Sequence, residues 1–396
     1  MSIFNSLGSN YSGAFVKRSL RPFLPGRVKT DLTQKLQADY QAQSVILTYK
    51  GREAITLILK QFQLPADSYV AVNGYTCYVV YAAIEAAGYK PYLIDIPTDS
   101  LNFSAAALEQ AFKAEPNIQA VVIQNTLGMP ADIAAIKALC DQHKLPLIED
   151  LAHSAGLVYP TGEQAGEVGD AAALSFSQDK IIDAVSGGAA IFKTLETTAE
   201  PSFHVSQMLR WQAFWYPLNT HFIRATHRLG LGKIWLKMLR TFKLLPNQMA
   251  GDPGHIRALP KRQAYLALTA LQNLQTILEH RQAIAEVYRQ ALPANIQLPH
   301  QNGALYIRFP LLVDNPRDLE KYLKDANIYI GNPWYDAVIA PGRYMELTHY
   351  QPGQCPNAES IAAHIVNLPT HINISEQQAK ELAGKVNEWL TLQSNQ

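Results

Sequence analysis

A lysine and an aspartate follow two strand-like segments of this sequence, and their chemistry can be argued from their neighbours. Lys180 lies in SFSQDKIIDAVSGG (175–188), after the small, apolar stretch DAAALSF and before a pair of glycines. Asp150 ends the apolar run LPLIED (145–150). A lysine directly after such a buried-looking strand is unusual, because an ammonium group is costly to keep away from water. Either Lys180 is an ordinary surface residue, or the fold holds its amine where chemistry needs it.

The pair indicates chemistry with an aldehyde cofactor. A lysine amine can form a Schiff base with such a cofactor, of which pyridoxal 5'-phosphate (PLP) is the common one. PLP is an electron sink only while its ring nitrogen is protonated, and a carboxylate beside that nitrogen raises its pKa by roughly 1–3 units. Asp150 could supply this carboxylate. The cofactor phosphate needs backbone donors at a helix N-terminus, and KGREAITLILKQF (50–62) offers Gly51 at a helix start with Arg52 in the first turn.

The elements that must position these residues alternate between strand and helix patterns over residues 45–195. Short apolar runs rich in β-branched or aromatic residues predict strands, and alanine-rich stretches between them predict helices. Strands are expected at 68–73, 90–96, 118–124, 145–150, 172–177 and 188–193, and helices at 77–87, 104–114 and 131–143. This alternation implies right-handed crossovers and a mostly parallel sheet with helices on both faces, which is an α/β fold.

Polar and ionisable residues follow several of these strands. Ligands of open α/β sheets bind beyond the carboxyl ends of the strands. GYTC (74–77) and NTLG (125–128) come after two strands, His153 lies three residues beyond Asp150, and Ser177 and Lys180 follow a fourth strand. We therefore expect one site along this rim of the sheet.

The second half of the chain has a different character. Residues 203–245 are aromatic and basic and are predicted to be helical, and 263–292 is predicted to be one long helix. A strand at 304–313, a helix at 317–326 and a terminal helix at 375–391 indicate a smaller α+β lobe. The predicted division is a basic N-terminal segment (1–35), a large PLP-binding domain (36–200), a basic, aromatic, helical insertion (201–255) and a small C-terminal domain (256–396).

The composition indicates a compact, soluble protein of the reducing cytoplasm. The chain has 396 residues, of which 48% are hydrophobic and 17% charged. No apolar run is long enough to span a bilayer, and the first residues do not resemble a secretory signal. Its three cysteines, Cys77, Cys140 and Cys355, have no metal-ligand spacing, so we expect neither disulfides nor a metal site. We also expect no nucleic-acid partner.

Ordered sequence blocks resemble the DegT/StrS family of PLP-dependent sugar aminotransferases, which have the aspartate-aminotransferase-type fold (PLP-dependent transferase fold type I). The similar segments run from about residue 45 to the C-terminus, apart from 200–250. They are GREAITLIL, VNGYTCYVVYAAIEAAGYKPYLIDI, GMPADIAAIKALCDQHKLPLIEDLAHSAG, SFSQDKIIDAVSGG and CPNAESIAAHIVNLPTH. Each match alone is weak, but five in the right order identify the family.

The resemblance assigns roles to individual residues. It implies that Lys180 binds the cofactor covalently and then shuttles a proton, while Asp150 holds the pyridinium nitrogen. It places His153 near the phenolic oxygen of the cofactor. Ser175 would bind the phosphate through its hydroxyl. The backbone N–H groups of Gly51, Arg52 and Glu53 would bind the same phosphate, with the Arg52 side chain as a candidate ligand.

Four departures from the family pattern stand out. Arg52 replaces the usual threonine, and Cys77 stands where an aromatic ring often stacks on the cofactor, so Tyr75 or Tyr78 is a candidate for that role. The segment G-x-N-Y-R, which reaches into the neighbouring subunit in the family, appears as PGHIR with His255 in place of the asparagine. The substrate-side motif H-Y-x-P-x-H is absent, and IGNPWYDAVIAP (330–341) occupies its region.

The resemblance implies a homodimeric, PLP-dependent aminotransferase. It would transfer an amino group from an amino acid such as glutamate to a keto sugar, nucleotide-linked, in cell-surface polysaccharide or amino-sugar biosynthesis. One alternative is another PLP-dependent sugar-modifying enzyme, such as a dehydratase, although the family's dehydratases lack the lysine. A second alternative is a non-catalytic member that acts as a regulator or a membrane-bound scaffold.

The charges of the chain are unevenly distributed. The net charge is only +1, yet no acidic residue precedes Asp31 and none lies within 201–251. In HFIRATHRLGLGKIWLKMLRTFKLL (221–245), basic residues at helix spacing stand beside aliphatic and aromatic ones. This segment, within 203–245, either lies on an anionic membrane surface at the inner face of the membrane or packs on the protein or its dimer mate while its charges attract substrate phosphates. The sequence leaves both open.

Overall fold

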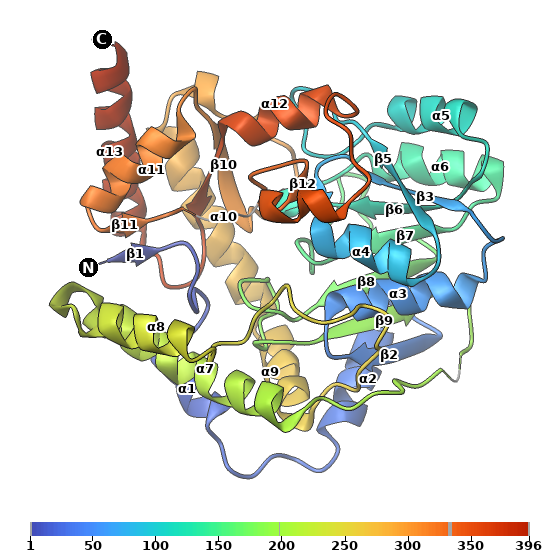
Figure 1. Cartoon of the computed structure of the whole chain (residues 1–396), viewed down its shortest axis with the longest axis horizontal. Helices are drawn as coiled ribbons and strands as arrows, with labels where there is room; N and C mark the ends of the chain where they lie inside the picture. Colours follow the sequence, from blue (N-terminus) through green and yellow to red (C-terminus); the bar gives the residue numbers. More distant parts are fainter. Residues whose placement is uncertain (1, 198, 332–334, 395–396) are drawn as a thin grey trace.

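A seven-stranded sheet with the order β2-β9-β8-β7-β6-β3-β5 forms the centre of the molecule (Figure 1). The structure is a computed structural model that describes residues 2–197, 199–331 and 335–394. The strands are β2 (Ser44–Thr48), β3 (Tyr69–Asn73), β5 (Lys90–Ile94), β6 (Ile118–Gln124), β7 (Leu147–Asp150), β8 (Ala171–Ser175) and β9 (Gly188–Phe192). Strand β9 is antiparallel to both of its neighbours, and the remaining pairs are parallel. The predicted α/β class with a mostly parallel sheet is confirmed.

Helices cover both faces of the sheet because its strands are apolar on both sides. On β6, Val121 and Ile123 join one hydrophobic cluster, whereas Ala120 and Val122 join the other. Helices α3 (Gly51–Phe62) and α4 (Tyr78–Ala86) contribute apolar residues to the second cluster, and α5 (Ala105–Ala114) and α6 (Ile133–His143) contribute to the first. The ends of the predicted strands and helices in this region differ from the observed ends by only a few residues.

Local side-chain chemistry fixes where several helices begin. Ser104 precedes α5 and its hydroxyl accepts the Ala107 N–H, while Asp132 precedes α6 and accepts the Ala135 N–H. The predicted single helix over 263–292 is wrong in one respect. It is divided into α9 (Lys261–Gln272) and α10 (Leu274–Ala291), because Asn273 leaves the helical conformation with φ −111° and ψ 13°.

The C-terminal part is the predicted α+β lobe. Strands β10 (Arg308–Leu312) and β13 (Ile365–Pro369) form an antiparallel pair, so the predicted strand over 304–313 is shorter than expected. Around the pair lie α10, α11 (Pro316–Asp325), α12 (Pro356–His364) and α13 (Glu376–Ser394) (Figure 1). The short strand β12 (Ile339–Ala340) pairs with β4 (Thr76–Cys77) of the large domain, and this pairing brings the lobe to the rim of the sheet.

The N-terminal segment and the insertion pack together. Strand β1 (Ile3–Phe4) pairs with β11 (Ile328–Tyr329) of the C-terminal lobe. Helix α1 (Gly13–Ser19) contacts α7 (Gln207–Thr226), and α7 contacts α8 (Leu231–Thr241). Helix α2 (Val28–Asp39) packs on α9. Residues 203–245 thus contain two α-helices joined by a short 3-10 helix (His227–Leu229). The predicted division of the chain at 35, 200 and 255 stays a prediction.

Replacing Gly188 with alanine tests how tightly α3 packs on the sheet. A Cβ atom at Gly188 would lie 2.7 Å from the backbone nitrogen of Gly51 and 2.8 Å from the Leu174 carbonyl oxygen. Because these neighbours are backbone atoms, Gly188→Ala should lower the free energy of unfolding in urea by about 1–3 kcal/mol. Gly384→Ala is the matched control, since nothing lies within 4 Å of its Cβ position in α13. A Gly188→Ala protein as stable as the control would contradict this packing.

Candidate active site

The carboxyl ends of β7 and β8, the start of α3 and a segment of the C-terminal lobe enclose one cavity. Two adjoining parts of it share eight lining residues, and the larger part has a volume of about 280 Å³. Among the predicted site residues, the cavity is lined by Gly51, Arg52, Cys77, Asp150, His153, Ser175 and Lys180. Residues from segments far apart in the sequence therefore meet at the edge of the sheet formed by the carboxyl ends of its parallel strands, where ligands of such sheets bind.

Lys180 lies in the loop that follows β8, and its surroundings lower the pKa of its amine. Burial is the main cause, and it is partly offset by Cys77, Asp150 and Asp179. The loop is held at its backbone, since the Lys180 carbonyl oxygen accepts a hydrogen bond of 2.9 Å from the Asn10 side chain. A lysine with a lowered pKa has more of its neutral, nucleophilic form at neutral pH.

Asp150 is the last residue of β7, and its carboxylate is buried at the floor of the cavity. One carboxylate oxygen accepts the Ala152 N–H at 3.0 Å. Burial raises the pKa of Asp150, while the Ala152 N–H and the charge of Lys180 act in the opposite direction. A carboxylate in this position lacks much of its hydration, so a cation placed beside it, such as a protonated ring nitrogen, gains a strong partner.

His153 is held as a neutral ring with a defined tautomer. Its Nδ1 accepts the Leu127 N–H at 3.2 Å, so the proton of the neutral ring is on Nε2. Burial lowers the pKa of His153 well below its usual range, and the charges of Lys180 and Arg308 add to this effect. Leu127 has a left-handed backbone with φ 54°, an uncommon conformation for leucine that directs its N–H at the ring. His153 can therefore donate a hydrogen bond from Nε2.

The start of α3 packs directly on the end of β8. A Cβ atom at Gly51 would lie 2.8 Å from the Cβ of Ser175 and 3.1 Å from its hydroxyl oxygen, so only glycine fits there. The Glu53 N–H donates to the Lys50 carbonyl oxygen at 3.2 Å. The first N–H groups of a helix have no partner within it, which leaves those of Gly51 and Arg52 as donors beside the Ser175 hydroxyl. Binding of phosphate by these groups stays a prediction.

The side chains of Arg52 and Glu53 bind the segment that returns from the insertion. Arg52 donates to the Met249 carbonyl oxygen at 2.9 Å and also to the Gln248 carbonyl oxygen. The Glu53 carboxylate is fully buried and accepts the Arg257 backbone N–H at 2.8 Å and its Nε–H at 2.9 Å. Arg52 thus holds residues 248 and 249 of the cavity wall in place, and Glu53 holds Arg257 farther along the same segment.

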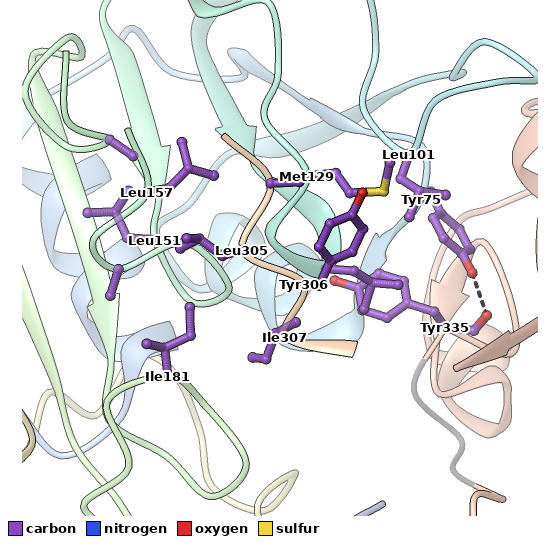
Figure 2. Close-up of a cluster of buried hydrophobic side chains, with 14 of the residues drawn as sticks. Tyr75, Leu101, Met129, Leu151, Leu157, Ile181, Leu305, Tyr306, Ile307 and Tyr335 are labelled. Carbon is purple, nitrogen blue, oxygen red and sulfur yellow. Dashed lines mark hydrogen bonds between the residues drawn. The ribbon is translucent and has the colours of Figure 1, made fainter. Parts of the chain in front are cut away.

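Of the aromatic candidates, Tyr75 and Tyr78 lie outside the cavity lining. Tyr75 is fully buried in the core, and its hydroxyl donates to the Tyr335 carbonyl oxygen at 2.7 Å, as Figure 2 shows. Tyr78 stacks on Tyr344, with 4.9 Å between the ring centroids. The Tyr335 ring lines the cavity and lies 5.6 Å from the His153 ring, centroid to centroid. Tyr335 belongs to the segment 330–341, of which residues 332–334 lie outside the described residues.

Sequence reasoning missed three features of the site. Tyr335, Lys50 and the segment 246–249 all line the cavity. The basic residues of the lining are Lys50, Arg52, Lys180 and Arg343, and Asp150 is an acidic one. A cavity whose lining has more basic than acidic side chains attracts anionic ligands such as phosphates and carboxylates.

The fold is that of the PLP-dependent transferases of the aspartate-aminotransferase type. A model of the DegT/DnrJ/EryC1/StrS aminotransferase family matches residues 16–387. The chain belongs to this family, as the sequence blocks predicted, and aminotransferases of this family use PLP.

Individual relatives are similar over most of their length. A pleiotropic regulatory protein of Geobacillus stearothermophilus is 24% identical over 370 residues, which cover 91% of this chain and 89% of the relative. The dTDP-3-amino-3,4,6-trideoxy-alpha-D-glucose transaminase of Micromonospora megalomicea is 24% identical over 353 residues, covering 86% and 84%. The structure of Helicobacter pylori PseC, an aminotransferase involved in pseudoaminic acid biosynthesis, has a TM-score of 0.71 at 17% identity and covers 98% of this chain and 99% of its own. This last likeness shows the fold.

Replacing Asp150 with asparagine removes the charge and keeps the shape. We expect Asp150→Asn to retain bound PLP and to lose transamination by on the order of 100-fold or more, because a neutral amide cannot keep the ring nitrogen protonated. Single-turnover kinetics with an amino donor would measure this. Asp67→Asn, at an exposed residue paired with Lys90, is the control and should leave the rate unchanged. Near-normal turnover by Asp150→Asn would assign the ring nitrogen to another partner.

Proposed function

We propose that the protein is a PLP-dependent aminotransferase that moves an amino group from an amino acid, such as glutamate, to a nucleotide-linked keto sugar. The observation that carries the proposal is the meeting of Lys180 and Asp150 at one basic cavity beyond the carboxyl ends of β7 and β8. The residues fit the cofactor: an amine for its aldehyde, a carboxylate for its ring nitrogen, and a helix N-terminus with Ser175 for its phosphate.

The chain's own residues account for the proton transfers. PLP, when bound, supplies an electron sink that lets a proton leave the carbon that bears the amine. Lys180, with its lowered pKa, can accept that proton and return it elsewhere. His153, a neutral Nε2–H donor, can hold an oxygen of the ligand. The Tyr335 side chain and the segment 246–249 cover the cavity and limit the access of water.

The basic lining supports an anionic sugar substrate. Arg343 is exposed beside the cavity, where it can meet a group that projects from the mouth. A nucleotide-linked sugar carries its phosphates at one end and its reacting carbonyl at the other, which matches a cavity with the buried Lys180 inside and the exposed Arg343 at its edge. The names of two relatives, a transaminase of a dTDP-linked amino sugar and an aminotransferase of pseudoaminic acid biosynthesis, agree with this substrate class.

The other functional hypotheses make different demands on the site. A dehydratase would keep the cofactor, but the retained Lys180 favours transamination. A regulator would need no working site, and the relative named a pleiotropic regulatory protein makes that hypothesis concrete. The retention of a lysine and a carboxylate, both buried at one cavity, favours an enzyme. We further propose a cytoplasmic homodimer, as the resemblance of residues 253–257 to a segment that crosses between subunits implies.

Purified protein should carry PLP covalently bound to Lys180. The bound cofactor should give a yellow absorbance band that borohydride reduction makes permanent, and Lys180→Ala should lose both the band and all transfer of nitrogen from glutamate to a nucleotide-linked keto sugar. Lys113→Ala, at an exposed lysine of α5, is the control. A Lys180→Ala protein that still turns over an amino donor would show that another group does this chemistry. Wild-type protein that binds no PLP would favour the regulator.

We also propose that the insertion binds an anionic membrane surface from the cytoplasmic side. Helix α8 packs on α7 through Gly232 and Leu239, which are its buried residues. Its outward side carries Leu231 and Ile234, which are 54% and 69% exposed, next to the exposed Lys233 and Lys237. Exposed apolar residues beside a basic stripe are typical of an interfacial helix. No helix in the described part of the chain is long and apolar enough to cross a membrane.

The charge of this surface favours an anionic membrane over a second copy of the chain as its partner. A two-fold contact would place the same patch on both sides of the interface. Helices α1, α7 and α8 contain no acidic residue, and α1 and α8 lie on either side of α7 (Figure 1). Basic side chains would therefore face basic side chains in such a dimer. An anionic lipid surface complements this charge, and each basic residue near it contributes about 1 kcal/mol.

Co-sedimentation with vesicles tests the membrane proposal. The protein should bind anionic but not neutral vesicles, and salt should weaken the binding. Lys233/Lys237/Arg240→Glu and, separately, Ile234→Asn should each reduce binding. Lys321/Lys324/Lys380→Glu, which makes the same change of charge at exposed sites of α11 and α13, should reduce it less. No binding to anionic vesicles at low salt, or an equal effect of the two triple variants, would overturn the proposal.

A further inference from the structure

Lys50 lines the active-site cavity immediately before the first residue of α3. Its side chain comes from the turn between β2 and α3, and the residue is only 5% exposed. The ammonium lies 5.4 Å from the centre of the Tyr49 ring. Within the part of the chain that the structure describes, no carboxylate or hydrogen-bond acceptor is paired with it. A buried ammonium in this state retains its full capacity to donate hydrogen bonds.

The surroundings of Lys50 are unfavourable to its charge. Burial lowers its pKa to about 7, and the positive charges of Arg52 and Arg257 contribute to this, while Glu53 opposes it. Glu53 does not compensate Lys50 directly, because its carboxylate is engaged by Arg257. An ammonium that is both buried and close to other cations is costly unless an anion comes to the site.

The hydrogen-bond donors next to Lys50 indicate which kind of anion the site would bind. Next to Lys50 are the N–H groups at the start of α3, which carry the positive end of the helix dipole. The Ser175 hydroxyl adjoins them, since a Cβ at Gly51 would lie 3.1 Å from its oxygen. Ser177 also lines the cavity. An ammonium, backbone N–H groups and a hydroxyl that line one cavity at the start of a helix match the several oxygens of a phosphate group better than a single carboxylate.

We propose that Lys50 binds a phosphate group at the N-terminus of α3, and that this phosphate is the one carried by PLP. The proposal rests on the proposed function for the identity of the ligand. Two other candidates for this phosphate contact have different partners. The Arg52 guanidinium binds the carbonyl oxygens of residues 248 and 249, and the exposed His255 lies beside Asp252 and Phe203. Lys50 thus supplies the charged contact from within the same chain.

The alternative source of the phosphate is the substrate. A sugar nucleotide also carries phosphates, and these would give Lys50 a role in substrate affinity instead of cofactor affinity. The position of Lys50 favours the cofactor, because its backbone adjoins Gly51 and hence the Ser175 hydroxyl, whereas the exposed Arg343 lies at the mouth. The two sources are separable by experiment.

The test compares PLP with pyridoxal, which has the same ring and aldehyde but no phosphate. Dissociation constants of both for the full-length apoprotein would be measured by absorbance and fluorescence titration. Lys50→Met should weaken PLP binding by about 10- to 100-fold, the range for one charged hydrogen-bonded contact, and should change pyridoxal binding by less than about 2-fold on the same grounds. Lys50→Arg should keep most of the preference for PLP. Lys60→Met, at an exposed lysine of the same helix, is the control.

Each outcome has a definite meaning. Equal losses for PLP and pyridoxal, or no loss for either, would overturn the proposal. An unchanged affinity for PLP with a raised KM for the sugar nucleotide would assign Lys50 to the substrate and overturn the cofactor assignment. If Lys50→Met does not fold, Lys50→Gln takes its place under the same criteria, and Lys50→Arg, which retains the charge, must keep more of the preference for PLP than Lys50→Gln for the proposal to stand. Failure of the wild-type protein to bind PLP would instead refute the proposed function.

Discussion

The close approach of α3 to the last residue of β8 and the first residue of β9 is the contact on which the geometry of the site depends. Gly51 and Gly188 make it possible, because a Cβ atom at either position would lie under 3 Å from the opposing residue. The contact places the free N–H groups of α3 beside the Ser175 hydroxyl, and the loop with Lys180 begins a few residues later. It also places the side chain of Lys50, which precedes the helix, inside the same cavity. A helix that began one residue farther away would leave these groups without a common ligand.

A buried hydrogen-bond network connects the Lys180 loop to the rest of the molecule. Asn10 donates to the Lys180 carbonyl oxygen at 2.9 Å and to the Asp183 carboxylate at 3.2 Å. Arg281 of α10 donates to the Asn10 side chain at 2.9 Å, and also to Thr370 beyond β13 at 3.1 Å. The N-terminal segment is thus the connection between the lysine loop of the large domain and the C-terminal lobe. Such fully buried polar groups specify one arrangement, because each is costly to leave unpaired.

Local patterns predicted six of the seven strands of the sheet, but they missed β2, which joins the sheet as the antiparallel neighbour of β9. Long-range packing determined what the sequence did not disclose. The strands β6 and β7 and the helices α5 and α6 could be read from periodicity and capping residues, and the residues at the strand ends follow from that order. Tyr335 could not be found in this way, since it reaches the site through the pairing of β12 with β4, across more than half of the chain (Figure 2 shows its contact with Tyr75). The same holds for Arg52, which looks like a phosphate ligand in sequence but binds the carbonyl oxygens of residues 248 and 249.

Because Arg52 binds residues 248 and 249, the insertion contributes both an outward surface on α8 and a part of the cavity wall. Helix α8 presents basic and apolar side chains outward, and the chain returns from it directly through residues 246–249 into the cavity wall. Positive charge has a different consequence in each place: outside, Lys233 and Lys237 stay hydrated, whereas inside, Lys50 and Lys180 have lowered pKa values because burial removes their hydration. Only residues 242–245 separate the end of α8 from the part of the chain that lines the cavity, so the proposed membrane-binding helix and the cavity wall belong to one continuous segment held in place by Arg52.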